Sequence, residues 1–197
     1  MCIRDRVVAA ASEHGRVVTN GMSVYRRDGE NGNGALLVEI GPEDYGTDHP
    51  LAGMYYQRQL EQAAFLAGGG DYRAPAQLAG DFLAGRRSHT LGRVRPTYLP
   101  GVRLGDLSEC LPAVIVEALR EGLMAFEARI PGFLQPDALL TAVESRSSSP
   151  VRMERGADYS ANIAGVYPCA EGAGYAGGIL SAAVDGIHCA EALYRSL

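Results

Sequence analysis

The chain has 197 residues, 47% of them hydrophobic, a formal net charge of −5 at pH 7 and a mean hydropathy of −0.05. This composition is ordinary for a soluble globular protein of one domain or two small ones. The charges form no basic block, which excludes nucleic-acid binding through a basic surface. No apolar run approaches the ~20 residues that a membrane helix needs, and no signal-peptide core is present.

Cysteine and histidine usage indicates the compartment and excludes several chemistries. The four cysteines, Cys2, Cys110, Cys169 and Cys189, share no C-x-x-C spacing, so neither a zinc site nor a disulfide framework is indicated. The four histidines are scattered, without H-E-x-x-H spacing or a G-x-S-x-G partner. We therefore expect a reduced, cytoplasmic protein with no metal site, and the sequence offers no strong candidate for a catalytic acid or base.

The first six residues differ in character from the rest of the chain. MCIRDR is followed at once by VVAAA, an apolar run that already has the pattern of a strand, with no turn or cap before it. We expect residues 1–6 to be a foreign or non-native start and the chain to be truncated ahead of residue 7, and we leave MCIRDR out of the fold prediction.

The N-terminal half alternates strand, turn and helix signals. Apolar, β-branched runs predict strands, Gly-rich and Pro-rich stretches predict loops, and helical spacing of Leu51, Met54 and Leu60 predicts a helix. In chain order the predictions are strands at 7–11 and 16–25 around a turn at 13–15, a loop at 26–34, a strand at 35–40, turns at 41–50 and a helix at 51–67.

The middle of the chain carries the clearest helix signal. Leu111, Ile115, Leu119 and Leu123 recur at helical spacing behind Pro112, which suits a first helical turn. Residues 106–109 resemble a capping box. The further predictions are a short helix at 76–85, an irregular connection at 86–101, a helix at 111–126, strands at 138–144 and 165–169, and a polar loop between those two strands.

The stretch EGAGYAGGILSAAVDG, directly after GVYPC near the end of the chain, has the order strand, Gly-rich turn and helix that binds dinucleotides. Gly172, Gly174, Gly177 and Gly178 would let the backbone approach a ligand closely, and Glu171 could accept hydrogen bonds from ligand hydroxyls. The helix from about Gly178 would present unpaired N–H groups and a partial positive charge. Its small apolar face, which includes Ile179, Ala183 and Leu193, would pack on a sheet. The spacing alone leaves open a tightly packed helix start without any ligand.

A family resemblance favours the ligand. The C-terminal segment resembles the flavin-binding segment of flavoproteins with two dinucleotide folds. The chain from Val7 onward is similar to the C-terminal part of a bacterial family of FAD-dependent dehydrogenases of unassigned substrate. The matching stretches are VVAAASE, VVTNGMS, PTYLPGVRLGDLSECLP, LLTAVESRSSSPVRM and the closing Gly-rich turn.

The resemblance implies an α/β fold: a partial Rossmann-like FAD/NAD(P)-binding fold that lacks its N-terminal βαβ unit and carries an inserted mixed α+β domain. It implies a substrate-type domain over 7–128 and the C-terminal half of the FAD domain over 129–197. It also implies FAD as cofactor, with Glu171 near the ribityl chain or pyrophosphate and the backbone along the isoalloxazine. Arg146 and Ser147 would lie in an anion- or carbonyl-binding loop near the flavin, and the alternative for this loop is a solvated turn. The implied cofactor-binding residues are Arg146, Ser147, Glu171, Gly172, Ala173, Gly174, Tyr175, Gly177, Gly178 and Ile179.

The function implied is that of a flavin-dependent oxidoreductase, a full-length enzyme of which this fragment alone would be inactive. The expected partners are FAD and either NAD(P)H or a small-molecule substrate, with no nucleic acid and no membrane. The alternative is a non-catalytic binding or interaction module that takes no cofactor.

Overall fold

The computed structural model describes residues 6–23, 25–26 and 29–197 and divides the chain into two compact units. The first unit comprises the described residues up to Ile40 together with Arg58–Ser145, and the second comprises Gly41–Gln57 with Arg146–Leu197. Three parts of the sequence prediction lie outside the described residues: residues 1–5 of the expected foreign start, residue 24 of a predicted strand, and residues 27–28 of a predicted loop.

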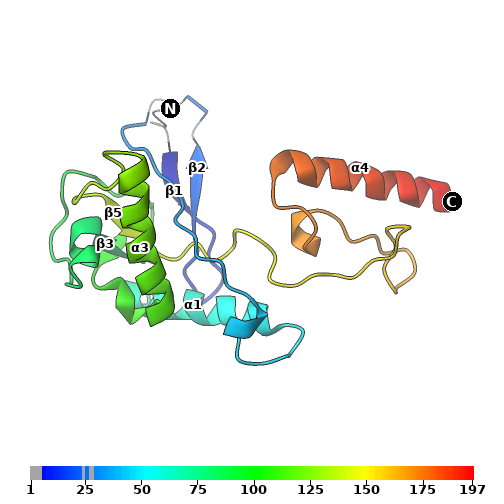
Figure 1. Cartoon of the computed structure of the whole chain (residues 1–197), viewed down its shortest axis with the longest axis horizontal. Helices are drawn as coiled ribbons and strands as arrows, with labels where there is room; N and C mark the ends of the chain where they lie inside the picture. The colour runs from blue at the N-terminus through cyan, green and yellow to red at the C-terminus, as the bar shows by residue number, and fades with distance from the viewer. Residues whose placement is uncertain (1–5, 24, 27–28) are drawn as a thin grey trace. The chain divides into compact units, whose positions relative to one another are not determined.

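The first unit begins with an antiparallel hairpin of β1 (Arg6–Ala10) and β2 (Thr19–Ser23), in which Val8 faces Gly21 (Figure 1). The two predicted strands and the intervening turn are thus confirmed. The second strand is shorter than predicted because Val17 and Val18 are buried and hydrogen-bond elsewhere. The amide of Val17 donates to the carbonyl of Glu61 (3.0 Å) rather than to the hairpin partner.

A three-stranded sheet forms the centre of this unit, in the order β4–β3–β5. The middle strand β3 (Ala74–Leu78) runs parallel to β4 (Val102–Leu104) and antiparallel to β5 (Leu139–Thr141). The prediction of a strand at 138–144 is confirmed in shorter form. The helix predicted at 76–85 is wrong at its start, since residues 76–78 belong to β3 and only α2 (Ala79–Leu83) is helical. The pairing of β3 with both β4 and β5 overrides the helix propensity of the alanine-rich sequence.

Two predicted strands are absent from the described part of the chain. Residues 35–40 form no strand, although Leu36, Val38 and Ile40 alternate inward and pack on the core. Residues 165–169 form no strand, because Gly165 has a φ of +79° and the amide of Val166 turns back to the carbonyl of Ile163 (3.2 Å). The apolar run at 35–40 therefore marks burial without a strand, whereas at 165–169 Pro168 is buried but Val166 is 42% exposed.

The long helices agree with the sequence. The predicted helix at 51–67 is α1 (Ala52–Gly68), and the one at 111–126 is α3 (Ala113–Arg129), which begins after Pro112 at the N-cap. Between β4 and α3, the 3₁₀ turn η2 (Leu107–Glu109) is capped by Asp106, whose carboxylate accepts from the amide of Ser108 (2.9 Å). The other half of the predicted capping box is not formed, because Glu109 pairs with Arg87.

Apolar side chains from the strands and helices form one core in the first unit. Among its most buried members are Val17, Ala64, Ala74, Phe82, Leu107, Ile115 and Leu123. The second unit contains the 3₁₀ turns η1 (Pro42–Asp44) and η3 (Glu171–Ala173), the first residues of α1, and α4 (Ile179–Ser196). The chain is therefore a mixture of helices and small sheets, which agrees with the predicted α/β class at that level.

Buried polar groups connect the end of β3 to the segments beside it. The fully buried side chain of Gln77 donates to the carbonyl of Arg86 (2.8 Å) and accepts from the amide of Leu107 (2.8 Å). Close by, the buried hydroxyl of Ser88 accepts from the amide of Leu78 (2.9 Å) and donates to the carboxylate of Asp81 (2.7 Å). These bonds hold the irregular connection after α2 in place, because a buried backbone group without a partner is costly.

Replacing Gln77→Met keeps the shape of the side chain but leaves the amide of Leu107 and the carbonyl of Arg86 without partners. We expect the free energy of unfolding to fall by about 2 kcal/mol or more, measured by urea denaturation. The matched control is Gln62→Met on the exposed side of α1, for which a change within about 0.5 kcal/mol is expected. Equal effects of the two substitutions would contradict a bridging role for Gln77.

Candidate functional site

The Gly-rich segment forms a turn that leads directly into the last helix. After Ala170, which has a φ of +59°, the 3₁₀ turn η3 ends at Gly174 in the left-handed region (φ +81°). Gly178 is the N-cap and α4 begins at Ile179, so the predicted helix start is confirmed. The order is loop, turn and helix, however, because residues 165–169 form no strand.

The glycines of this turn differ in what surrounds them. A methyl group added at Gly172 or Gly177 would meet no atom within 4 Å. At Gly174 it would lie 3.0 Å from the Cα of Arg152 and 3.1 Å from the carbonyl oxygen of Val151. Gly174 is thus needed for close packing within the chain, and its φ also favours glycine. Gly172 and Gly177 leave the main chain uncovered.

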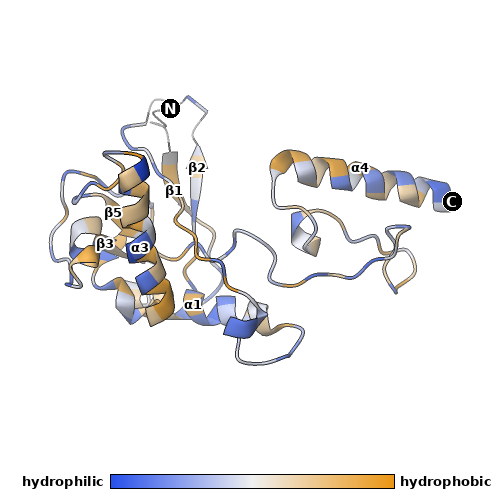
Figure 2. Cartoon of the chain, in the orientation of Figure 1, coloured by the Kyte–Doolittle hydropathy of each residue, from blue (hydrophilic) through white to orange (hydrophobic). Residues whose placement is uncertain are grey.

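The first turn of α4 is apolar and exposed. Ile179 and Leu180 are 91% and 81% exposed, and the helix is most hydrophobic near its start (Figure 2). Gly178 has no side chain with which to cap the helix, although its own amide donates to the hydroxyl of Ser181 (3.2 Å). The N–H groups of the first turn therefore carry the partial positive charge of a helix N-terminus without a capping side chain.

The predicted packing face of α4 needs correction. Cys189 is buried and Asp185 is partly buried, whereas Ile179, Ala183 and Leu193 are exposed. Within the described residues of the second unit there is no strand, so this helix packs on a loop instead of a sheet. A polar interaction, which the hydrophobic pattern does not indicate, determines which face of α4 is packed against the loop.

That interaction centres on Arg155. Its guanidinium forms a bidentate pair with Asp185 of α4 (2.6 and 3.0 Å) and donates to the carbonyl of Pro168 (2.7 Å). It also lies 3.7 Å from the ring centroid of Tyr175 and 4.5 Å from that of Tyr159. Because the Arg155 and Asp185 side chains are only 10% and 16% exposed, this pair is largely removed from water.

Asp185 links the helix to the turn as well as to the loop. Besides pairing with Arg155, its carboxylate accepts from the amide of Ala170 (2.8 Å), next to η3. The bonds from Arg155 and from the Ala170 amide lower the pKa of Asp185 to about 2. The sequence analysis missed both residues. One signal was present, since Asp185 is the only acidic residue in the first twelve positions of a largely apolar helix.

Tyr175 and Ala173 are enclosed by neighbouring segments of the chain. The Tyr175 ring lies between the guanidinium groups of Arg152 (4.4 Å) and Arg155, and its hydroxyl donates to the carbonyl of Met153 (3.0 Å). The amide of Met153 donates to the carbonyl of Ala173 (3.1 Å), and Ala173 is 4% exposed. Residues 151–155 therefore hold the turn in place through their contacts with Ala173 and Tyr175.

The other predicted site residues lie at the surface of the second unit. Glu171, Gly172, Gly177 and Gly178 are exposed, as are Arg146 and Ser147. The contacts described for the turn come from residues 151–155, so the proximity of Arg146 and Ser147 to a flavin stays a prediction. The described residues include no group of three or more His, Cys, Asp or Glu placed to hold a metal ion, and no helix among them is long and apolar enough to cross a membrane.

The Arg155–Asp185 pair predicts a pH dependence. The pKa of Asp185 is lower in the folded chain than the ~3.9 of a free aspartate. The pair therefore stabilises the fold fully above pH ~4, and this contribution is lost as the pH falls toward 2. We expect Asp185→Asn to lower the melting temperature near neutral pH and the wild-type advantage to vanish near pH 2, measured by circular dichroism. Glu154→Gln, in the same loop but exposed, is the control. If the wild-type melting temperature exceeded that of Asp185→Asn by the same amount at every pH, the pH dependence would not come from the Arg155–Asp185 pair.

Comparison with known proteins identifies the family. Residues 1–147 match the family described as FAD-dependent protein, C-terminal domain-like. The chain is also 53% identical over 192 residues to an uncharacterized protein of Clostridium beijerinckii, a match that covers 97% of this chain and 36% of the relative. The chain thus spans about a third of the length of the curated relative that it matches. The match covers most of the sequence, and the chain belongs to the family of FAD-dependent proteins, C-terminal domain-like.

Proposed function

We propose that this chain is the C-terminal part of a flavin-dependent oxidoreductase and that the turn before α4 contributes to its FAD site. Membership of an FAD-dependent protein family supports the cofactor. The observation that carries the proposal is the uncovered main chain at Gly172 and Gly177, next to a helix start that has no capping side chain. Main chain left uncovered at two glycines beside a positive helix end suits a planar cofactor that gains negative charge.

In this proposal the flavin lies along one edge of the turn. Gly177, Gly178 and Ile179 offer exposed backbone and apolar surface, and Gly172 offers a second open stretch beside the carboxylate of Glu171. The side chains of Ala173 and Tyr175 are held by residues 151–155, so in this proposal they contribute through their main chain. In this proposal the exposed edge of the turn contacts the flavin, and residues 151–155 hold the enclosed edge in place.

The role of the chain in this proposal is to bind the flavin, to orient it and to polarise it. A bound flavin supplies the hydride-accepting chemistry. The first-turn amides of α4 place a partial positive charge at one fixed point, which favours negative charge there by a few tenths to 1 kcal/mol, about the size seen at exposed helix ends. The charge of Arg155 is balanced by Asp185, so the positive potential near the turn comes from the helix amides and from Arg152, whose guanidinium lies 4.4 Å from the ring centroid of Tyr175.

The domain organisation and the partners belong to the same proposal. In it, residues 129–197 complete a Rossmann-like FAD domain, residues 7–128 form a substrate-type insertion, and Arg146 and Ser147 bind an anion or carbonyl near the flavin. NAD(P)H or a small molecule would exchange the hydride. The grip on the ADP half of FAD would come from sequence that is not part of this chain, so we expect the isolated chain to take up little flavin and to be inactive.

The experiment places valine at the two open glycines in a longer protein that carries this chain behind an N-terminal ADP-binding unit. Gly172→Val and Gly177→Val add bulk where no atom lies within 4 Å and where the backbone φ is ordinary, so the fold should be kept. We expect absorbance near 450 nm in the purified parent protein and at least a tenfold loss of FAD affinity in Gly177→Val, measured by titrating the apoprotein.

The matched control is Gly34→Val, at another exposed glycine with open space around it, in the first unit. It should leave FAD affinity unchanged. A parent protein that purifies without flavin and cannot be reconstituted would contradict the proposed function. A yellow parent whose affinity is unchanged by both turn substitutions would keep the cofactor but place it elsewhere.

A further inference from the structure

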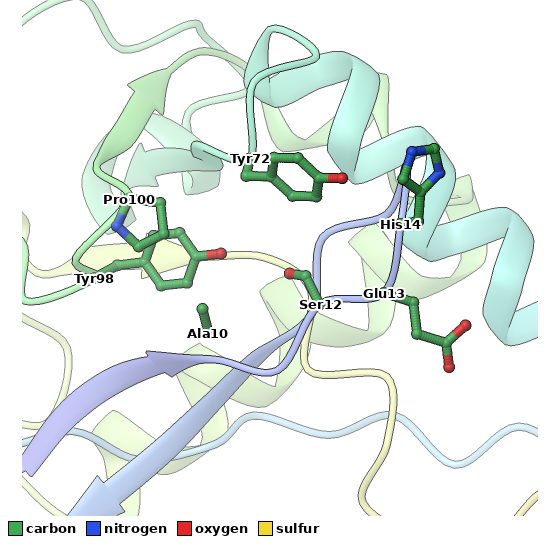
Figure 3. Close-up of a pocket in the computed structure, with 7 residues that line it drawn as sticks. All are labelled: Ala10, Ser12, Glu13, His14, Tyr72, Tyr98 and Pro100. Carbon is green, nitrogen blue, oxygen red and sulfur yellow. The ribbon is translucent and has the colours of Figure 1, made fainter.

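The first unit contains a pocket of about 490 Å³ where the β1–β2 turn meets two loops around the three-stranded sheet (Figure 3). Ala10 lines it from the end of β1. Ser12, Glu13 and His14 line it from the β1–β2 turn, Tyr72 from the segment before β3, and Tyr98 and Pro100 from the loop before β4. This volume is in the range of small-molecule sites. All of its lining residues belong to the first unit.

The hydroxyl of Tyr98 is the feature that points to a ligand. Tyr98 is 3% exposed, and its hydroxyl is buried with no hydrogen-bond partner among the described residues. The group is directed into the space lined by Ala10, Ser12 and Tyr72 (Figure 3). Buried hydroxyls nearly always have a partner, because leaving one unpaired is costly. The hydroxyl oxygen itself has almost no accessible surface in the unliganded chain, so an oxygen of a bound molecule would accept this bond after a small shift of the pocket wall exposes it.

Tyr72 supplies a second donor in a fixed position. Its backbone is in the left-handed region (φ 66°), which is uncommon for a tyrosine, and its ring packs edge-on against Phe65 with centroids 5.1 Å apart. The hydroxyl accepts from the amide of Gly15 (3.2 Å), which leaves its own proton available for donation. Strained backbone that holds a side chain at a cavity is typical of binding sites.

The charges and walls of the pocket define the class of ligand. Glu13 is paired with Arg16 (2.6 Å), so this arginine does not present an uncompensated cation for a phosphate. The hydroxyl of Ser12 accepts from the amide of Val18 (3.0 Å) and is therefore positioned by the hairpin. Neutral phenolic donors beside tyrosine rings, alanine and proline suit a flat, largely apolar molecule with a hydrogen-bond acceptor.

We propose that this pocket binds a small planar ring compound through a carbonyl oxygen, which accepts a hydrogen bond from the hydroxyl of Tyr98. Tyr72 provides the second donor, and Pro100 and Ala10 contact the ring. The proposal is independent of flavin binding, because every group it uses lies in the first unit.

The test uses 4′-fluoroacetophenone as the probe and 1-ethyl-4-fluorobenzene, which has the same ring and two-carbon chain but no carbonyl oxygen, as the comparison compound. Binding to the intact 197-residue chain is followed by ¹⁹F NMR. We expect the ketone to bind, with the ethyl compound weaker by about threefold to tenfold, the effect of one hydrogen bond. No detectable binding of the ketone, or equal affinity for both compounds, would overturn the proposal.

Two variants locate the effect. Tyr98→Phe removes only the unpaired hydroxyl, so it should melt no lower than the wild-type chain and bind the ketone about threefold to tenfold more weakly. Tyr72→Phe should weaken binding in the same direction. Tyr25→Phe, at a fully exposed ring, is the control and should leave affinity unchanged. A folded Tyr98→Phe protein that binds the ketone as tightly as wild type would refute the assignment.

Discussion

The pairing of Arg155 with Asp185 is the constraint on which the second unit depends. That unit has no sheet among its described residues and few buried apolar side chains, so it cannot rely on a large hydrophobic core. One guanidinium instead joins the helix, the carbonyl of Pro168 and two tyrosine rings. Removing one partner of such an enclosed pair leaves a charge without compensation, which costs far more than an exposed salt bridge is worth.

This arrangement explains why α4 presents apolar residues to the surface. A helix packed by hydrophobic area alone would bury Ile179 and Leu193, yet the Asp185 face is turned inward because its carboxylate serves both Arg155 and the amide of Ala170. The exposed apolar start of the helix is thus a consequence of how the turn is anchored. In the proposed function it is also the surface that meets the cofactor.

The sequence allowed the long helices, the hairpin and the start of α4 to be predicted, because each has a strong local signal: helical spacing behind Pro112, β-branched runs around Gly15, and glycine before an apolar run. The predictions failed where the structure is decided by pairing between residues far apart in the sequence. Ala76 and Gln77 have helix-compatible neighbours but lie in the central strand, since β4 and β5 supply partners on both sides. Residues 165–169 have strand-like composition but form no strand. For the site, the glycine pattern located the turn, whereas Arg155 could not be identified because its partner is thirty positions away.

The division of α1 between the two units bears on how the protein can be cut. The helix begins in the second unit and continues in the first, and Gly53 within it is so close to Pro150 that an added methyl group would lie 2.9 Å from that proline's Cβ atom. The family match ends at residue 147, three positions before this contact. A fragment that stops where the match stops would therefore lose the cover over the start of its own helix, and shortened versions of the protein should retain at least Pro150.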